Sequence, residues 1–163
     1  MKRICFSLLL IVASLCASAQ VGDLFAEFRH APNAEYLHLP RALLSMLKPV
    51  VRLSDSDQEA RAVLKAIRSV RVLDLEECSP KVKNRFMEAV ANFNPGAYTE
   101  LIRSNQDDER TLILYKMRRH AIRELLIVES SKDDAQIVQV KGRIRPENIN
   151  DIIDTTNKKK RKE

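Results

Sequence analysis

Residues 111–144, TLILYKMRRHAIRELLIVESSKDDAQIVQVKGRI, contain the strongest fold signal in this chain. This stretch predicts three strands, because it holds three runs rich in β-branched and aliphatic residues: Thr111 to Met117, Ala121 to Glu129 and Ala135 to Ile144. The connections 118–120 and 130–134 are short enough for hairpin turns, so these strands should be antiparallel neighbours. The third run alternates between residues 137 and 144, which predicts a sheet with one covered face.

A strand and a helix precede this meander. Residues 69–75, SVRVLDL, have the composition of a strand. Ser79 then supplies a hydroxyl for a helix N-cap, and Pro80 suits the first helical position. The helix that follows stops at Asn94-Pro95-Gly96, and residues 98–103 predict a weaker strand. Apolar residues recur along this helix at spacings of three and four: Val82, Phe86, Ala89, Val90 and Phe93.

The N-terminal third is predicted to be mostly helical. We expect a helix over 23–30, a strand over 35–39, a helix from Pro40, a polar linker over 52–57 and a helix over 58–66. A last short helix opens at Pro146, with three isoleucines facing inward: Ile149, Ile152 and Ile153. Together these elements predict an α+β fold, an antiparallel sheet with helices packed on one face, preceded by a short helical N-terminal part.

The first 19 residues have the features of a cleavable export signal. A positive start, Lys2-Arg3, precedes an apolar run over residues 4–16. Ala17-Ser18-Ala19 then places small residues at the two positions that a signal peptidase reads. Cleavage between Ala19 and Gln20 is therefore expected, and the mature chain of 144 of the 163 residues should be periplasmic or secreted.

The alternative signal is that of a lipoprotein, with Cys16 as the lipidated residue. That site requires a small residue just before the cysteine, and Leu15 stands there instead. The apolar run is also shorter than the roughly 20 residues that a membrane-spanning helix needs. No later stretch is long and apolar enough to serve as a transmembrane anchor, so we expect a soluble mature protein.

Removal of the signal would leave Cys78 as the only cysteine. An exported chain with one cysteine has no intrachain disulfide, so its stability must come from packing. Cys78 is then a nucleophile, an intermolecular bridge or a small, partly buried residue at a strand end. The third alternative is favoured, because no catalytic cysteine signature accompanies it.

The basic character of the chain is concentrated near its C-terminus. The formal net charge is +6, of which Lys158–Glu163 carries +4 and Lys2-Arg3 carries +2. The body from Gln20 to Asn157 is therefore neutral, so we expect a basic tail rather than a basic face, and no nucleic-acid partner. A solvated, disordered tail is the favoured prediction, and contact of the tail with anionic lipid or polysaccharide is the alternative.

Side chains that could bind a metal ion or take part in catalysis are few and scattered along the sequence. His30 and His38 lie eight positions apart, without a carboxylate or thiol at ligand spacing, which argues against a zinc site. The acidic run 105–109 lacks the alternating ligands and central glycine of a calcium loop, so we expect a polar loop. His120 follows two arginines and is expected at a positive turn.

Glu124 places a negative charge inside the apolar run 122–128. A buried carboxyl there would be a candidate general base. The favoured alternative is an edge or solvent-facing position, or a cross-strand partner for Lys116 or Arg143. No G-x-S-x-G, P-loop or dinucleotide motif is present, and the chain has only three glycines. We therefore predict no catalytic residue, no cofactor and no metal site.

Several short pieces of the sequence resemble a known family. They are the signal ending Ser18-Ala19-Gln20, the strand SVRVLDL with its following helix, and the later runs ILYKM, IRELLIV and AQIVQVKGRI. In this order they resemble the domain-of-unknown-function family 4252, small exported proteins of Bacteroidetes, over residues 22–154. The resemblance implies export and an α+β fold, but no reaction, cofactor or catalytic residue.

These features predict a signal peptide over 1–19, a single domain over 20–157 and a basic tail over 158–163. The expected function is that of a non-catalytic envelope module, which binds another protein or an envelope polymer through its sheet edges. The alternative is an unrecognised periplasmic hydrolase that uses scattered residues such as Glu124 and His120. Neither the partner nor the oligomeric state follows from the sequence.

Overall fold

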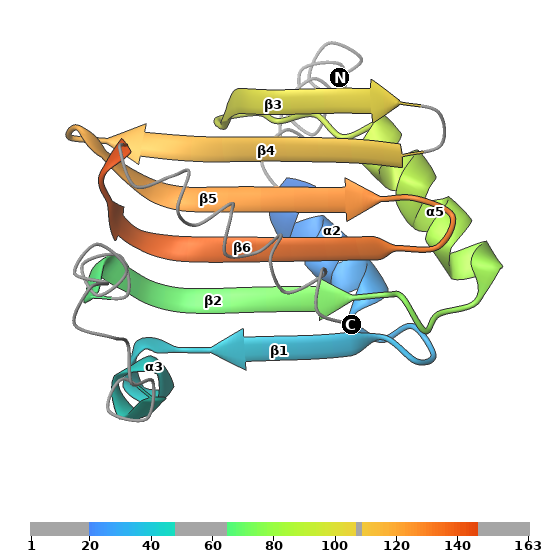
Figure 1. Ribbon diagram of the computed structural model, residues 1–163, viewed down its shortest axis with the longest axis horizontal. Coiled ribbons are helices and arrows are strands. Elements are labelled where there is room, and N and C mark those ends of the chain that lie inside the picture. Colours follow the sequence, from blue (N-terminus) through green and yellow to red (C-terminus); the bar gives the residue numbers. More distant parts are fainter. Residues whose placement is uncertain (1–19, 48–64, 107–108, 147–163) are drawn as a thin grey trace, which may run out of the picture.

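The computed structural model describes residues 20–47, 65–106 and 109–146. Its centre is a six-stranded antiparallel sheet with the strand order β1-β2-β6-β5-β4-β3 (Figure 1). The strands are β1 (Glu35–Leu39), β2 (Ile67–Asp74), β3 (Thr99–Gln106), β4 (Glu109–Arg118), β5 (Ala121–Ser130) and β6 (Ala135–Ile144). The predicted C-terminal meander is confirmed, and β2 and β1 extend the sheet beyond β6.

The helices with described bounds are α2 (Gln20–Phe28), α3 (Arg41–Leu47) and α5 (Pro80–Ala91). α2 and α5 cover one face of the sheet, which we call the helix face, whereas α3 lies beside one end of β1 and β2 (Figure 1). The predicted α+β class is therefore confirmed. α5 begins at Pro80 as expected, but the Ser79 hydroxyl makes no capping hydrogen bond. The Ser79 carbonyl instead accepts from the amides of Val82 and Lys83.

Aromatic packing joins the two helices over the helix face. Phe28 of α2 and Phe86 of α5 meet edge to face, with their ring centres 5.3 Å apart. Both rings are at most 2% exposed. Beneath them lie fully buried side chains from four different strands: Leu73, Leu114, Leu126 and Ile137. Each large apolar side chain contributes about 1.5–3 kcal/mol when it is buried, so this cluster is the main source of stability on this face.

The opposite face of the sheet carries a second buried apolar cluster. It consists of Ile113, Ile122, Leu125, Ile127, Val138, Val140 and Ile144. The prediction of one covered face is therefore wrong, since neighbouring residues of β6 such as Ile137 (0%) and Val138 (9%) are both buried. β5 and β6 are interior strands with aliphatic residues on both faces, and the alternation that suggested one polar face holds only near the end of β6.

Several predictions fall on the hairpin between β3 and β4 or outside the described residues. The expected loop 105–109 is wrong, because Asn105 and Gln106 pair across the hairpin with Arg110 and Glu109. Backbone pairing at a sheet edge needs no apolar side chain, which is why a polar run continues the strand. The linker 52–57, all but the last two residues of 58–66, the helix after Pro146 and the tail 158–163 lie outside the described residues.

Candidate functional site

The carboxylate of Glu124 belongs to a hydrogen-bonded network on the helix face. Tyr98 donates its hydroxyl to Glu124 Oε2 at 2.8 Å, and Gln139 donates from Nε2 to the same oxygen at 3.1 Å. Arg71 donates to Gln139 Oε1 from Nε at 2.7 Å and also from Nη2. Lys141 Nζ lies 3.8 Å from Glu124 Oε2. Side chains from β2, β5 and β6 thus meet that of Tyr98, the residue just before β3.

Burial governs the chemistry of this network, which we call the polar network (Arg71, Tyr98, Glu124 and Gln139). Gln139 is only 2% exposed, so its amide is removed from water and needs the partners that it has. Burial, reinforced by the hydrogen bond to Glu124, raises the pKa of Tyr98 well above its ordinary value, because both effects favour the neutral phenol. Lys116 Nζ lies 4.1 Å from the centre of the Tyr98 ring, in a cation–π contact.

The register explains which basic residues face Glu124. The carboxylate lies on an interior strand, opposite Lys116 on β4 and Lys141 on β6. Lys116 therefore lies directly across from Glu124, as predicted. The predictions that Glu124 lies on an edge strand or opposite Arg143 are wrong. The β5–β6 hairpin closes at Ser130 and Ala135, which fixes Lys141 and not Arg143 opposite Glu124.

Glu124 and His120 do not form a catalytic pair. The carboxylate accepts two hydrogen bonds from groups within the fold, and the structure shows none between it and His120 among the residues that it describes. His120 lies in the exposed β4–β5 turn. The network therefore connects β2, β5 and β6 with the residue before β3, and His120 is not part of it.

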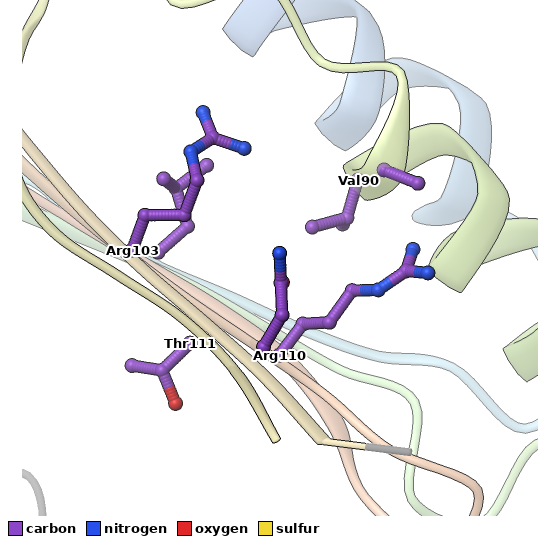
Figure 2. A pocket seen from close by; sticks show the side chains of 7 residues that line it. Val90, Arg103, Arg110 and Thr111 are labelled. Atoms are coloured by element: carbon purple, nitrogen blue, oxygen red, sulfur yellow. The ribbon is translucent and has the colours of Figure 1, made fainter. Parts of the chain in front are cut away.

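A hollow of about 180 Å³ lies between α5 and the strands β3 and β4. Figure 2 shows Arg103 and Arg110 on the same side of the sheet as Val90 of α5, while Thr111 points away from them. Both guanidinium groups are already engaged: Arg110 donates to the carbonyl oxygen of Met87 at 3.0 Å, and Arg103 pairs with Glu100 at 2.8 Å. The first bond connects β4 to the C-terminal part of α5, and the second lies within the edge strand β3.

The remaining candidate residues lie apart from one another. His30 accepts a hydrogen bond from its neighbour Arg29 at 3.0 Å, and His38 lies on β1. Cys78 is 5% exposed, and burial raises the pKa of its thiol, which makes it a poor nucleophile. The described residues contain no group of three side chains placed to hold a metal ion. Within the same ranges, no helix combines the length and the apolar character required to cross a bilayer.

Charge is segregated between the two ends of the sheet. The line of paired residues Leu39, Val70, Val140, Leu125 and Tyr115 runs across five strands. Beyond it lies what we call the basic end, where the described residues include ten lysines and arginines but only one carboxylate, Glu124. The basic residues are Arg41, Lys65, Arg68, Lys116, Arg118, Arg119, Arg123, Lys141, Arg143 and Arg145.

The other end of the sheet, which we call the acidic end, has a smaller excess of the opposite sign. Its described carboxylates include Glu35, Asp74, Glu76, Glu77, Glu100, Glu109, Glu129, Asp133 and Asp134, and the basic residues Arg71, Lys81, Lys83, Arg103, Arg110 and Lys132 lie among them. A net charge summed along the sequence hides this separation. A signal for it was present nonetheless, because the turn 118–120 is basic and the turn 130–134 is acidic. Successive turns of an antiparallel meander lie at opposite ends of the sheet, so their opposite charges predict a polarised domain.

The turn between β4 and β5 has an uncommon backbone. Arg118 pairs with Ala121, so Arg119 and His120 form a two-residue hairpin turn. Their φ angles are 53° and 56°. Such turns favour Asn-Gly, because larger side chains are strained at positive φ. The basic end thus keeps an arginine and a histidine at its tip, where residues without this strain would make the same turn.

The two edge strands are far more exposed than the interior strands. Seven of the eight residues of β3 and four of the five residues of β1 are exposed. Exposed apolar side chains occur on both strands: Leu37 (50%) on β1, and Leu101 (43%) and Ile102 (42%) on β3. The outward backbone groups of an edge strand are available for pairing with an added strand.

Comparison with protein families gave one finding. The profile of the family described as "Domain of unknown function (DUF4252)" matches residues 28–152, which agrees with the resemblance seen in the short sequence pieces. The comparison with curated proteins and the comparison with solved structures each found no match.

Proposed function

The chain belongs to the DUF4252 family, and from this premise we propose that it is an exported, non-catalytic binding module of the bacterial cell envelope. The observation that carries the proposal is the contrast between its interior and its borders. Glu124, the carboxylate that the sequence singled out as a candidate general base, is bonded within the fold. Both edge strands of the described sheet, β1 and β3, are exposed.

An exposed edge strand is a recognition element in its own right. A partner segment that adds to such an edge gains main-chain hydrogen bonds for affinity and side-chain contacts for specificity. β3 offers eight residues with Leu101 and Ile102 exposed, and β1 offers five with Leu37 exposed. These two edges support binding of an extended segment of another envelope protein.

The alternative of a periplasmic hydrolase has less support. It requires an acid–base group that is free to exchange a proton with a substrate. The Glu124 carboxylate accepts from Tyr98 and Gln139 instead, and His120 lies away from it in a turn. Glu124→Gln would therefore alter stability rather than remove an activity.

Photo-crosslinking in the exporting host tests the binding function. We expect a photoreactive residue at Leu37 or Ile102 to give a discrete crosslinked adduct. The same residue at Ala26, an exposed position on α2, is the matched control and should give none. If neither edge gave an adduct that Ala26 lacks, and an envelope hydrolytic activity disappeared with Glu124→Gln, the hydrolase would replace the binding module.

The mass of the protein recovered from the exporting host tests export separately. We expect the mature chain to begin at Gln20, the residue at which α2 also begins. A lipid adduct on Cys16, or retention of residues 1–19, would contradict both the cleavage site and the release of a lipid-free chain.

A further inference from the structure

We propose that the basic end of the sheet docks on the anionic phospholipid surface of a membrane. This goes beyond edge-strand binding, because it names a second surface with a different kind of partner. It draws on the proposed envelope location only for the presence of bilayers nearby. Two independent observations on the described residues carry it, the segregation of charge and the position of exposed apolar side chains.

The first observation is the charge of the basic end. Among the described residues it holds ten lysines and arginines and a single carboxylate, Glu124, which is paired with Lys141. The outermost groups, at Arg118, Arg119 and Arg143, are exposed to solvent. A cluster of this kind is attracted to the negative potential of a leaflet that contains anionic lipids. The acidic end has no such excess of cations, so attraction of the basic end sets one orientation, with the strands pointing at the membrane.

The second observation is that exposed apolar side chains lie at the same end as these cations. Met117 (48%) on β4 and Leu43 (46%) and Met46 (70%) on α3 are among the large apolar side chains that the fold leaves exposed. All three lie at the basic end (Figure 1). Exposed apolar groups beside lysine and arginine are typical of surfaces that enter the headgroup region, where the cations meet phosphates and the apolar tips meet acyl chains. A soluble polyanion would use the cations but gain nothing from the apolar side chains.

The strained β4–β5 turn agrees with a docking role. Arg119 and His120 are held at positive φ, where an Asn-Gly pair would be relaxed. Strain that persists at a surface turn points to a function for the residues concerned. Here it keeps basic side chains at the tip of the hairpin, the part of the domain that reaches the membrane first.

Binding of the protein purified from exporting cells to lipid vesicles tests the proposal directly. We expect sedimentation with phosphatidylglycerol vesicles, no sedimentation with phosphatidylcholine vesicles, and a steep loss of binding as salt is added. The variant Arg118→Glu/Arg119→Glu should bind phosphatidylglycerol at least about tenfold more weakly, since it reverses two charges at the tip.

The matched control makes the same change of net charge at the acidic end, with Lys81→Glu/Lys132→Glu at two exposed positions. It should keep its binding within about twofold, because these residues face away from the membrane in the proposed orientation. Equal losses for the two double variants would show that only net charge matters and would overturn the proposal.

A second pair of variants separates a bilayer from a soluble polyanion. Met46→Ser/Met117→Ser should weaken binding to phosphatidylglycerol vesicles severalfold and leave binding to heparin unchanged. Heparin binding as tight as vesicle binding, together with no effect of the methionine changes, would identify a polysaccharide-like partner and overturn the lipid proposal.

The tail needs its own control, since Lys158–Glu163 is also basic and lies outside the described residues. A chain that ends at Asn157 should keep most of its vesicle binding and its dependence on Arg118 and Arg119. If the shortened chain no longer bound, the tail would be the docking element and the basic end would not. Vesicle binding does not depend on crosslinks at Leu37 or Ile102, so failure of one proposal leaves the other standing.

Discussion

The helix face of the sheet has two halves of different chemistry. In one half, Phe28 and Phe86 pack edge to face over Leu73, Leu114 and other fully buried side chains. In the other half, the polar network connects β2, β5, β6 and the residue before β3 through hydrogen bonds of 2.7–3.1 Å. Both halves lie on the same sheet, and neighbouring residues of the same strands contribute to each.

The contrast between the two halves explains how one sheet tolerates a charge near its centre. Apolar burial is non-directional, so the first half gains stability in proportion to the area that it removes from water. The polar half gains little from burial and depends on complete pairing, because each unpaired buried group would cost about 1–3 kcal/mol. Loss of one side chain should therefore be most costly in the apolar half and more modest in the polar half.

Phe86→Ala in the apolar half should destabilise the fold more than any other change considered below. Phe86 is fully buried and contacts Phe28, so its removal leaves a cavity between α5 and the sheet. We expect the free energy of unfolding to fall by roughly 3–5 kcal/mol, measured by urea denaturation. A loss below about 1 kcal/mol would mean that the apolar half collapses to fill the cavity. It would contradict the expectation that the apolar half is more sensitive than the polar half to loss of one side chain.

Gly142→Ala tests the backbone beside the polar half. A Cβ at Gly142 would lie 2.5 Å from the carbonyl oxygen of Ala66, so β2 and β6 would have to move apart. We expect a loss of roughly 2–3 kcal/mol in the free energy of unfolding. Gly22→Ala is the matched control, because nothing lies within 4 Å of a Cβ there and the position is in α2, where alanine is favoured. A destabilisation by Gly22→Ala equal to that of Gly142→Ala would contradict this explanation.

Tyr98→Phe removes one donor from the polar network. Glu124 keeps its hydrogen bond from Gln139 and its contact with Lys141, so we expect a loss of only about 1–2 kcal/mol near neutral pH. Thermal or urea unfolding compared with Phe86→Ala measures the difference between the halves. A loss as large as that for Phe86→Ala would show that the network contributes as much stability as the apolar core.

The same variant changes the response to alkali. Because the folded state raises the pKa of Tyr98, the unfolded chain releases this proton first as the pH rises past about 10. The contribution of Tyr98 is therefore fully present below that pH and declines above it. We expect the wild-type free energy of unfolding to fall more steeply between neutral and strongly alkaline pH than that of Tyr98→Phe. Equal slopes for the two proteins would contradict the raised pKa.

The smallest expected effect is that of a reducing agent. Cys78 belongs to the apolar half, is 5% exposed and is a free thiol. We therefore expect the melting temperature of the protein recovered from exporting cells to stay unchanged when reductant is added at fixed protein concentration. A large drop in melting temperature would instead indicate a stabilising intermolecular disulfide, which would require Cys78 to be accessible from the apolar half.

Much of the fold was predictable, because its signals are local. The hydrophobic runs gave β4, β5 and β6 to within a few residues, and Pro80 with Asn94-Pro95-Gly96 marked the two limits of α5. The errors occurred where local pattern says little. The polar run 105–109 was expected to be a loop, yet most of it continues β3 and β4 as paired strand.

The polar network was less accessible to prediction. Glu124 stood out as a charge in an apolar run, but its partners Tyr98, Gln139 and Lys141 did not, because each is an ordinary residue in its own stretch of sequence. Lys116 was predicted as a cross-strand partner of Glu124, and in the structure its ammonium group makes a cation–π contact with the Tyr98 ring. Which side chain meets which depends on where the hairpins close, and one residue of difference in register changes every cross-strand partner.

Short-range periodicity and turn residues were enough to indicate the strands of the meander and the class of the fold, and a resemblance in short sequence pieces indicated the family. The pairing of β2 with β6, in which Arg71 meets Gln139 across 68 positions of sequence, became visible only in the three-dimensional structure. The same pairing, with the hairpins beside it, separates the basic end from the acidic end. Backbone hydrogen bonds allow many strand pairings, so the choice rests on packing of the whole sheet rather than on any one segment.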